Sequence, residues 1–222
     1  MNKQNRFLPT TKDEMKQRGW DELDVVLITG DAYIDSPFMG IAVVGRILED
    51  VGLRVGIIGQ PDINSDVDIK RLGEPKLFWG VSGGSIDSMV SNYTATKKFR
   101  NDDDYTPGGK NNKRPDRATL VYTNLIRRYF KNTAPIVLGG IEASLRRLTH
   151  YDYWSNTLRK PILFDSKADY MIYGMGEQAI IDLGLYLKEG KDVRTIAGLC
   201  YISKEPCKRV FTNSFAQRVF RE

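Results

Sequence analysis

The residues that could do chemistry here are carboxylates and glycines rather than imidazoles or thiols. The 222 residues include one histidine, His150, and two cysteines, Cys200 and Cys207. One imidazole and two thiols leave almost no room for a zinc site or a histidine-rich iron site, and iron–sulfur ligation needs more thiolates. Cysteine or serine catalysis would have to involve His150.

Four glycine-rich turns each follow a short apolar run. Glycine lets a ligand approach the backbone, and the N-terminus of a following helix offers free N–H groups. One such turn is ordinary, because tight strand-to-helix turns need glycine, but four at one sheet edge favour a ligand cleft. The predicted binding residues are Thr29, Gly30, Asp31, Tyr33, Ser82, Gly83, Gly84, Gly139, Gly140, Glu142, Gly174, Gly176 and Glu177.

None of these turns matches the dinucleotide fingerprint G-x-G-x-x-G with an acidic residue about 20 positions on, and the sequence has no P-loop. Carboxylates after the strands, at Asp31, Asp35, Glu142 and Glu177, could accept hydrogen bonds from a ligand or cap the following helix. For Glu142 and Glu177, each in a first helical turn, capping is the favoured role.

The basic and aromatic residues beyond the third of these turns allow two interpretations. Arg146 and Arg147 could bind phosphate or carboxylate, but a pair of arginines on a helix is usually a solvated face. His150 lies in an aromatic segment. A histidine in that setting is more often a packed, hydrogen-bonded residue than a catalyst.

Alternating strands and helices must position these turns. Strands buried on both faces are predicted at 24–30, 54–59, 77–81, 135–140 and 170–174, because these runs lack polar alternation. Apolar stripes predict helices at 38–48, 86–93, 118–129 and 180–187. The expected helix ends are Gly52 and Gly190, and the expected starts are Ser85 and Pro115 with Asp116.

This alternation predicts an α/β fold with a doubly wound, mostly parallel sheet of five or six strands, Rossmann-like or flavodoxin-like. One more strand could lie at 195–203. The expected organisation is an extension over 1–20, one domain over 21–192 and a connector over 193–222. Residues 96–117 carry little apolar content and are interpreted as a solvated, mobile insertion, or alternatively as a lid or docking loop.

Charge and hydropathy set limits on partners. The formal net charge is +5 and the pI is near 9.1, but lysine and arginine are spread widely, which does not favour a nucleic-acid partner. No run approaches the ~20 apolar residues of a membrane helix, and no signal peptide is evident. A cytoplasmic protein without a membrane partner is expected.

Several blocks closely resemble the N-terminal region of the YgiQ-type radical SAM proteins. The resemblance extends from about residue 7 to at least residue 187. The blocks are GW at 19–20, TGDAY at 29–33, KRPDRATLVYT at 113–123, GGIEASLRR at 139–147, HYDYWS at 150–155 and DSKAD at 165–169.

The resemblance implies a two-part protein. A domain similar to cobalamin-binding domains would precede a radical SAM barrel, in which Cys-x-x-x-Cys-x-x-Cys holds a [4Fe–4S] cluster that cleaves S-adenosylmethionine. That motif is absent here, so the sequence is expected to be the N-terminal part of a longer protein and not catalytic alone. Its expected partners are its own C-terminal radical SAM domain and an unknown substrate.

Cobalamin is a candidate cofactor of this domain. Histidine-ligating cobalamin domains carry Asp-x-His-x-x-Gly after the first strand, whereas residues 31–40 read DAYIDSPFMG. Many cobalamin-dependent radical SAM proteins are similar in lacking that histidine. Two alternatives stay open: a docking domain for a protein or RNA substrate that uses the charged insertion, and a small-molecule transferase that uses Asp31, Glu142 and His150.

Overall fold

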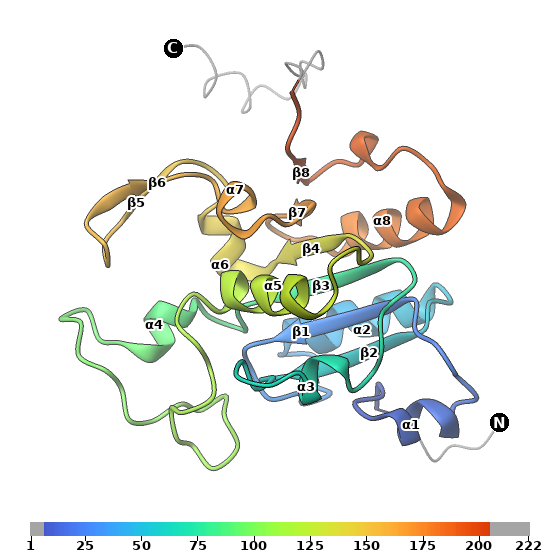
Figure 1. Ribbon diagram of the computed structural model, residues 1–222, viewed down its shortest axis with the longest axis horizontal. Helices are drawn as coiled ribbons and strands as arrows, with labels where there is room; N and C mark the ends of the chain where they lie inside the picture. The colour runs from blue at the N-terminus through green and yellow to red at the C-terminus, as the bar shows by residue number, and fades with distance from the viewer. Residues whose placement is uncertain (1–6, 205–222) are drawn as a thin grey trace.

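The computed structural model describes residues 7–204, and its centre is a six-stranded sheet (Figure 1). Five strands are parallel and the sixth is antiparallel to its neighbour, in the order β2-β1-β3-β4-β7-β8. The order of the five parallel strands is that of flavodoxin-like folds. The predicted mostly parallel α/β sheet is therefore confirmed. Its strands are β1 (Val25–Thr29), β2 (Val55–Gly59), β3 (Phe78–Ser82), β4 (Ile136–Gly139), β7 (Tyr170–Ile172) and β8 (Leu199–Tyr201).

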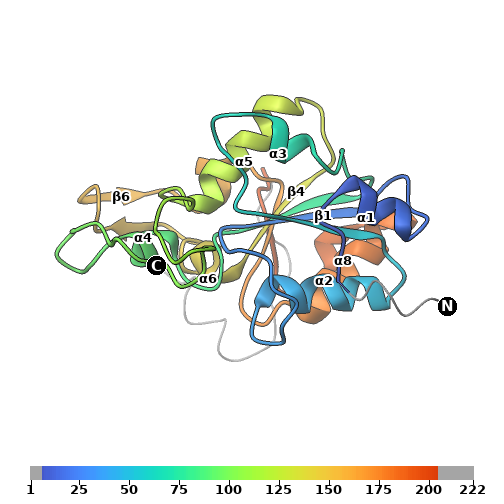
Figure 2. The same ribbon diagram turned by 90° about the horizontal axis from the view of Figure 1, so that it is seen from below.

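Helices cover both faces of the sheet, which explains why the strand sequences are apolar without alternation. Every residue of β1 is buried. Figure 2 shows α3 and α5 on one side of the sheet and α2 and α8 on the other. The helices are α1 (Lys12–Gln17), α2 (Gly40–Asp50), α3 (Val67–Lys70), α4 (Ser88–Asn92), α5 (Ala118–Tyr129), α6 (Gly140–Leu145), α7 (Ile162–Ser166), α8 (Glu177–Glu189) and the 3-10 helix η1 (Val193–Thr195).

Two helix ends and two helix starts were predicted. Gly52 follows the last turn of α2, and Gly190 caps α8 in the left-handed region, with φ of 67°. The predicted starts are wrong. Asp87, not Ser85, caps α4, because its carboxylate accepts from the Met89 backbone N–H at 2.9 Å. Arg117 is the N-cap residue of α5, so Pro115 and Asp116 precede that helix.

The predicted N-terminal extension packs on the domain from Leu8 onward. Leu8 is buried in the core between the sheet and helices α2 and α8. The Ile57 backbone N–H donates to the Pro9 carbonyl at 2.9 Å. At the other end of the described chain, η1 and β8 lie in the first part of the predicted connector. Strand β8 falls within the range 195–203 where one more strand was expected, and it pairs antiparallel with β7. Cys207 and the rest of the connector lie outside the described residues.

Most of residues 96–117 are exposed, as the predicted solvated insertion requires, but four polar side chains of the insertion are buried. Asp103, Thr106, Asn111 and Arg114 are buried. The prediction rested on the lack of apolar side chains, but these polar side chains are buried because they bond one another and the backbone. Asp103 accepts from the Thr106 hydroxyl at 2.7 Å, and the Asn111 amide donates to the Arg100 carbonyl at 3.0 Å.

A hairpin that the sequence did not predict lies beside this insertion. It consists of β5 (His150–Asp152) and β6 (Thr157–Arg159), which pair antiparallel. The Lys97 ammonium at the start of the insertion donates to the Tyr153 carbonyl at 3.0 Å and lies 4.5 Å from the Tyr153 ring centroid. The insertion and the hairpin thus support each other beyond the carboxyl ends of the strands.

Candidate functional site

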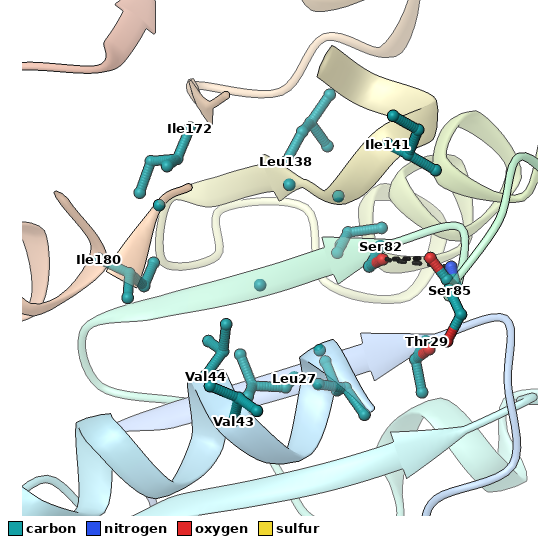
Figure 3. A pocket seen from close by; sticks show the side chains of 18 of the residues that line it. Leu27, Thr29, Val43, Val44, Ser82, Ser85, Leu138, Ile141, Ile172 and Ile180 are labelled. Atoms are coloured by element: carbon teal, nitrogen blue, oxygen red, sulfur yellow. Dashed lines mark hydrogen bonds between the residues drawn. The ribbon is translucent and has the colours of Figure 1, made fainter. Parts of the chain in front are cut away.

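A cavity of about 450 Å³ lies over the sheet between α2 and α8 (Figure 3). Small-molecule and cofactor sites commonly have about 300–1,000 Å³. It reaches the carboxyl ends of β1, β3 and β4, where ligands bind in open α/β sheets. In Figure 3, Val43 and Val44 of α2, Ile180 of α8 and Leu27 of β1 point into the same space.

The polar side chains of the cavity gather at its edge beyond the strands. Thr29, Ser82 and Ser85 lie there together in Figure 3. The Ser82 hydroxyl accepts from the Gly84 backbone N–H at 3.1 Å, which closes the turn after β3. The cavity therefore combines an apolar interior with a rim of hydroxyls and backbone groups, the composition of a ligand site.

Asp31 holds this rim rather than facing a ligand. Its carboxylate accepts from the Ser85 backbone N–H at 2.6 Å and from Arg114 Nη2 at 2.7 Å. Arg114 also donates to the Gly30 carbonyl at 3.1 Å and lies 3.4 Å from Asp103. Burial raises the pKa of the Asp31 carboxyl, and the bond from Ser85 and the charge of Arg114 offset part of that rise. The turn is thus anchored by a buried ion-pair cluster of Asp31, Arg114 and Asp103.

Glu142 is also a structural residue, although its expected role as the cap of its own helix is wrong. The side chain is buried and does not line the cavity. One carboxylate oxygen accepts from the Ser88 backbone N–H and the other from the Thr119 backbone N–H, both at 2.9 Å. Glu142 therefore caps α4 and α5, which begin beside each other beyond β3 and β4.

We expect Glu142→Gln to lower the free energy of unfolding by about 1–3 kcal/mol, because one amide group cannot accept both bonds as a carboxylate does. Urea unfolding measures this loss. Glu189→Gln is the matched control, since Glu189 is half exposed and forms an ion pair with the exposed Lys191. Equal losses in the two variants would contradict the capping role of Glu142.

Most glycines at this edge are required by packing. A Cβ atom on Gly30 would lie 2.1 Å from the Gly83 carbonyl oxygen, and one on Gly84 would lie 2.2 Å from the Asp31 carboxylate. Gly139 is different. It has an extended backbone with φ of −153°, and a Cβ there would meet no atom within 4 Å. Since neither backbone nor packing demands glycine at 139, we attribute it to space kept open in the cavity.

The structure brings most but not all of the predicted binding residues together. Of the thirteen, Thr29, Asp31, Ser82, Gly84, Gly139, Gly140, Gly174, Gly176 and Glu177 line the cavity, whereas Gly30, Tyr33, Gly83 and Glu142 do not. The Tyr33 hydroxyl instead accepts from the Leu8 backbone N–H at 3.2 Å. Sequence reasoning missed the apolar lining from α2, α8 and the turn before α2, since such spacing also describes core residues. The chief residues of this lining are Phe38, Ile41, Val43, Val44 and Ile180.

The other candidates for chemistry lie elsewhere. His150, the first residue of β5, lines a separate small cleft with Glu142 and Arg146. Its Nδ1 atom lies 3.1 Å from the Leu148 carbonyl oxygen. Arg146 forms an ion pair with Asp87, so it is not a free anion-binding group. Of the three residues considered for a transferase, Glu142 and His150 share this small cleft, whereas Asp31 lines the larger cavity. The lining of the larger cavity contains no histidine, lysine or arginine.

The mouth of the cavity is apolar and exposed. Phe38 is 91% exposed and Met175 is 93% exposed, and both lie at the carboxyl edge of the sheet. Further exposed apolar residues in the segments after these strands are Ile34, Val90, Phe99, Ile141, Leu145, Leu148 and Tyr173.

Within residues 7–204, no group of three potential ligands could hold a metal ion, and no helix has the length and apolar character to cross a membrane.

Comparisons with known proteins place this fold in a family. A family model described as radical SAM N-terminal matches residues 7–220. A UPF0313 protein of Fusobacterium nucleatum is 62% identical over 201 residues, which are 90% of this chain and 35% of that protein. The UPF0313 protein YgiQ of Salmonella typhimurium is 54% identical over 190 residues, 86% of this chain and 26% of that protein. The chain spans about a third or less of the length of these curated relatives.

Among solved structures, the radical S-adenosylmethionine methyltransferase TsrM from Kitasatospora setae, with cobalamin and a [4Fe–4S] cluster bound, has a similar fold. The TM-score is 0.54 at 20% sequence identity, and the match covers 82% of this chain and 29% of TsrM. At this identity the likeness establishes the arrangement of strands and helices.

Proposed function

The chain belongs to the radical SAM N-terminal family, and from that we propose that it is the N-terminal module of an enzyme that cleaves S-adenosylmethionine with a [4Fe–4S] cluster. The described residues do not fit the cluster itself. Cys200 is their one free cysteine, and they contain no group of three potential metal ligands. The cluster and S-adenosylmethionine are therefore assigned to the C-terminal part of the longer protein. The cobalamin-binding-like part is the domain of the six-stranded sheet, which includes Leu8 and strand β8 and so extends beyond the expected bounds 21–192 at both ends.

The role proposed for the domain is to bind part of a corrinoid in the cavity, or to position substrate there. The observation that carries this proposal is Gly139. Its missing side chain leaves the cavity open at the carboxyl edge, although neither its backbone conformation nor its packing requires glycine. The apolar interior suits a large, mostly uncharged ligand, and the rim offers hydroxyl and backbone groups to its polar substituents. TsrM, which has this fold, holds cobalamin.

A bound corrinoid would supply a redox-active cobalt. The cavity lining has no imidazole, so this chain would hold the corrinoid without a histidine ligand to the metal. Its own residues would act by shape and position. The ion-pair cluster of Asp31, Arg114 and Asp103 fixes the turn at Ser82–Ser85, and helices α2 and α8 form the apolar walls.

The test is retention of a corrinoid. The 222-residue chain is incubated with hydroxocobalamin and desalted, and its visible spectrum is recorded. We expect corrinoid absorbance at close to one equivalent per chain. A spectrum without corrinoid absorbance would overturn the cofactor part of the proposal and leave substrate positioning as the role of the cavity.

We propose that the C-terminal part of the longer protein packs against the exposed apolar mouth of the cavity and covers it. Large exposed apolar patches mark interaction sites. We expect Phe38→Ser with Met175→Ser to change the free energy of unfolding of the 222-residue chain by less than about 0.5 kcal/mol, because both side chains are solvated. In the full-length protein the same pair should lower the melting temperature by several degrees. Equal shifts in both proteins would contradict this assignment.

A further inference from the structure

One charge in the cavity has no partner. The ionisable side chains of the lining are those of Asp31 and Glu177. Asp31 forms an ion pair with Arg114, at 2.7 Å. Glu177 makes no hydrogen bond, ion pair or ring contact with any other residue in the described range 7–204. The cavity therefore presents a single uncompensated carboxylate to a ligand.

The fold places Glu177 at the mouth rather than in the apolar interior. It is the first residue of α8 and follows the turn Gly174-Met175-Gly176 at the carboxyl end of β7. Its side chain is exposed, and the neighbouring Met175 is almost fully solvated. The N-terminus of α8 stabilises a negative charge at this position. A ligand that filled the cavity would carry its outer substituents past this carboxylate.

This position has a direct consequence for the ligand. A carboxylate accepts hydrogen bonds from N–H and O–H groups, and such charge-assisted bonds are among the stronger ones. The same carboxylate repels a carboxylate or phosphate, because the lining offers no lysine, arginine or histidine to compensate. The cavity should therefore accept an amide substituent beside Glu177 and reject an acid.

We infer that Glu177 is a specificity-determining residue that selects corrinoids with amide rather than carboxylate substituents on the ring. The inference rests on the proposed corrinoid function and names the chemistry that the site selects. The primary amides on a corrin ring each have two N–H donors, whereas the precursors that precede amidation have carboxylates in the same places. The amidating reactions must then precede loading of this domain.

Two corrinoids without a nucleotide tail serve as probes for the 222-residue chain: dicyanocobinamide, with amides, and dicyanocobyrinic acid, with carboxylates. Dissociation constants are measured by titration of the visible spectrum. We expect the amide probe to bind about tenfold more tightly or better, which corresponds to one charge-assisted contact. The chain as a whole carries a net charge of +5, which would favour the acidic probe, so a preference for the amide has to arise locally.

Glu177→Gln should reduce this preference at least several-fold, mainly by improving binding of the acidic probe. The matched control is Asp182→Asn, which removes the same charge from the same helix at a residue bonded to Gln178 and outside the cavity. The control should keep the wild-type ratio. If Glu177 only stabilised the N-terminus of α8, its substitution would lower the free energy of unfolding and leave the ratio unchanged, which would overturn the inference. If the wild-type chain bound neither probe, the corrinoid function itself would fail, and the inference with it.

Discussion

Arg114→Met is expected to lower the free energy of unfolding by about 3–5 kcal/mol, the usual cost of removing one partner from a buried ion pair. The Arg114 side chain is fully buried, and its guanidinium lies between Asp31 and Asp103. Without it, two buried carboxylates face each other with no cation. Urea unfolding of the 222-residue chain measures the loss.

The control for this prediction is Arg100→Met in the same insertion. Arg100 is exposed, and within residues 7–204 its guanidinium donates to the Tyr93 carbonyl alone, at 3.0 Å. A loss below about 1 kcal/mol is expected there, because one exposed contact contributes little. Similar losses in the two variants would show that the insertion is anchored by something other than the cluster of Asp31, Arg114 and Asp103.

The Arg114→Met variant should also respond differently to pH. Burial already raises the pKa of Asp31, and loss of the Arg114 charge would raise it further. A carboxyl whose pKa is higher in the folded than in the unfolded state binds more protons when folded, so stability increases as pH falls towards that pKa. Part of the loss should therefore be recovered as the pH falls from neutrality towards the raised pKa of Asp31. A loss that stays constant over this range would contradict an unpaired buried carboxylate as its cause.

Gly139→Thr is expected to reduce corrinoid retention by at least about tenfold while leaving the fold intact. Gly139 is the N-cap residue of α6 with an extended backbone, and threonine suits both that position and that conformation. The new side chain would meet no protein atom near its Cβ and would occupy the cavity instead. The measurement is hydroxocobalamin bound after desalting, beside the urea midpoint of each protein.

A smaller change at the same residue sharpens this prediction. Gly139→Ala adds a single methyl group and should give an intermediate loss of corrinoid with an unchanged urea midpoint. Full retention in Gly139→Thr would show that the cavity is not where the corrinoid lies. A fall in the urea midpoint as large as the fall in retention would show that glycine is needed at 139 for folding.

The sheet was predictable because each strand is a short apolar run that packs against helices on both faces. Residues such as Val25 and Ile28 are fully buried, as apolar runs of this kind predict. The insertion at 96–117 is mostly exposed as predicted, but its buried polar residues were missed because composition does not reveal pairing. The sequence presents Asp103 and Arg114 as solvated charges, yet both are buried and lie 3.4 Å apart. Arg114 also donates to the carbonyl of Gly30, which lies 84 residues earlier in the chain.

The candidate site was predicted at its rim and missed in its interior. Glycine-rich turns at the ends of parallel strands converge by topology alone, which brought Gly84, Gly139 and Gly174 to one cavity. The sequence could not tell the open Gly139 from the tightly packed Gly30, because the difference lies in which atoms surround each backbone. Val43 and Val44 have the spacing of core residues. Their place in the cavity wall follows from how α2 and α8 pack over the sheet, which the sequence pattern does not show.

Hydrogen–deuterium exchange of the 222-residue chain, with and without saturating hydroxocobalamin, tests most directly whether the cavity is the corrinoid site. Binding there should slow exchange in three segments: 82–85, after β3; 139–145, from Gly139 through α6; and 174–180, which begins α8. Exchange in the hairpin at 150–159 should stay unchanged. Protection of the hairpin without protection of those three segments would contradict the account.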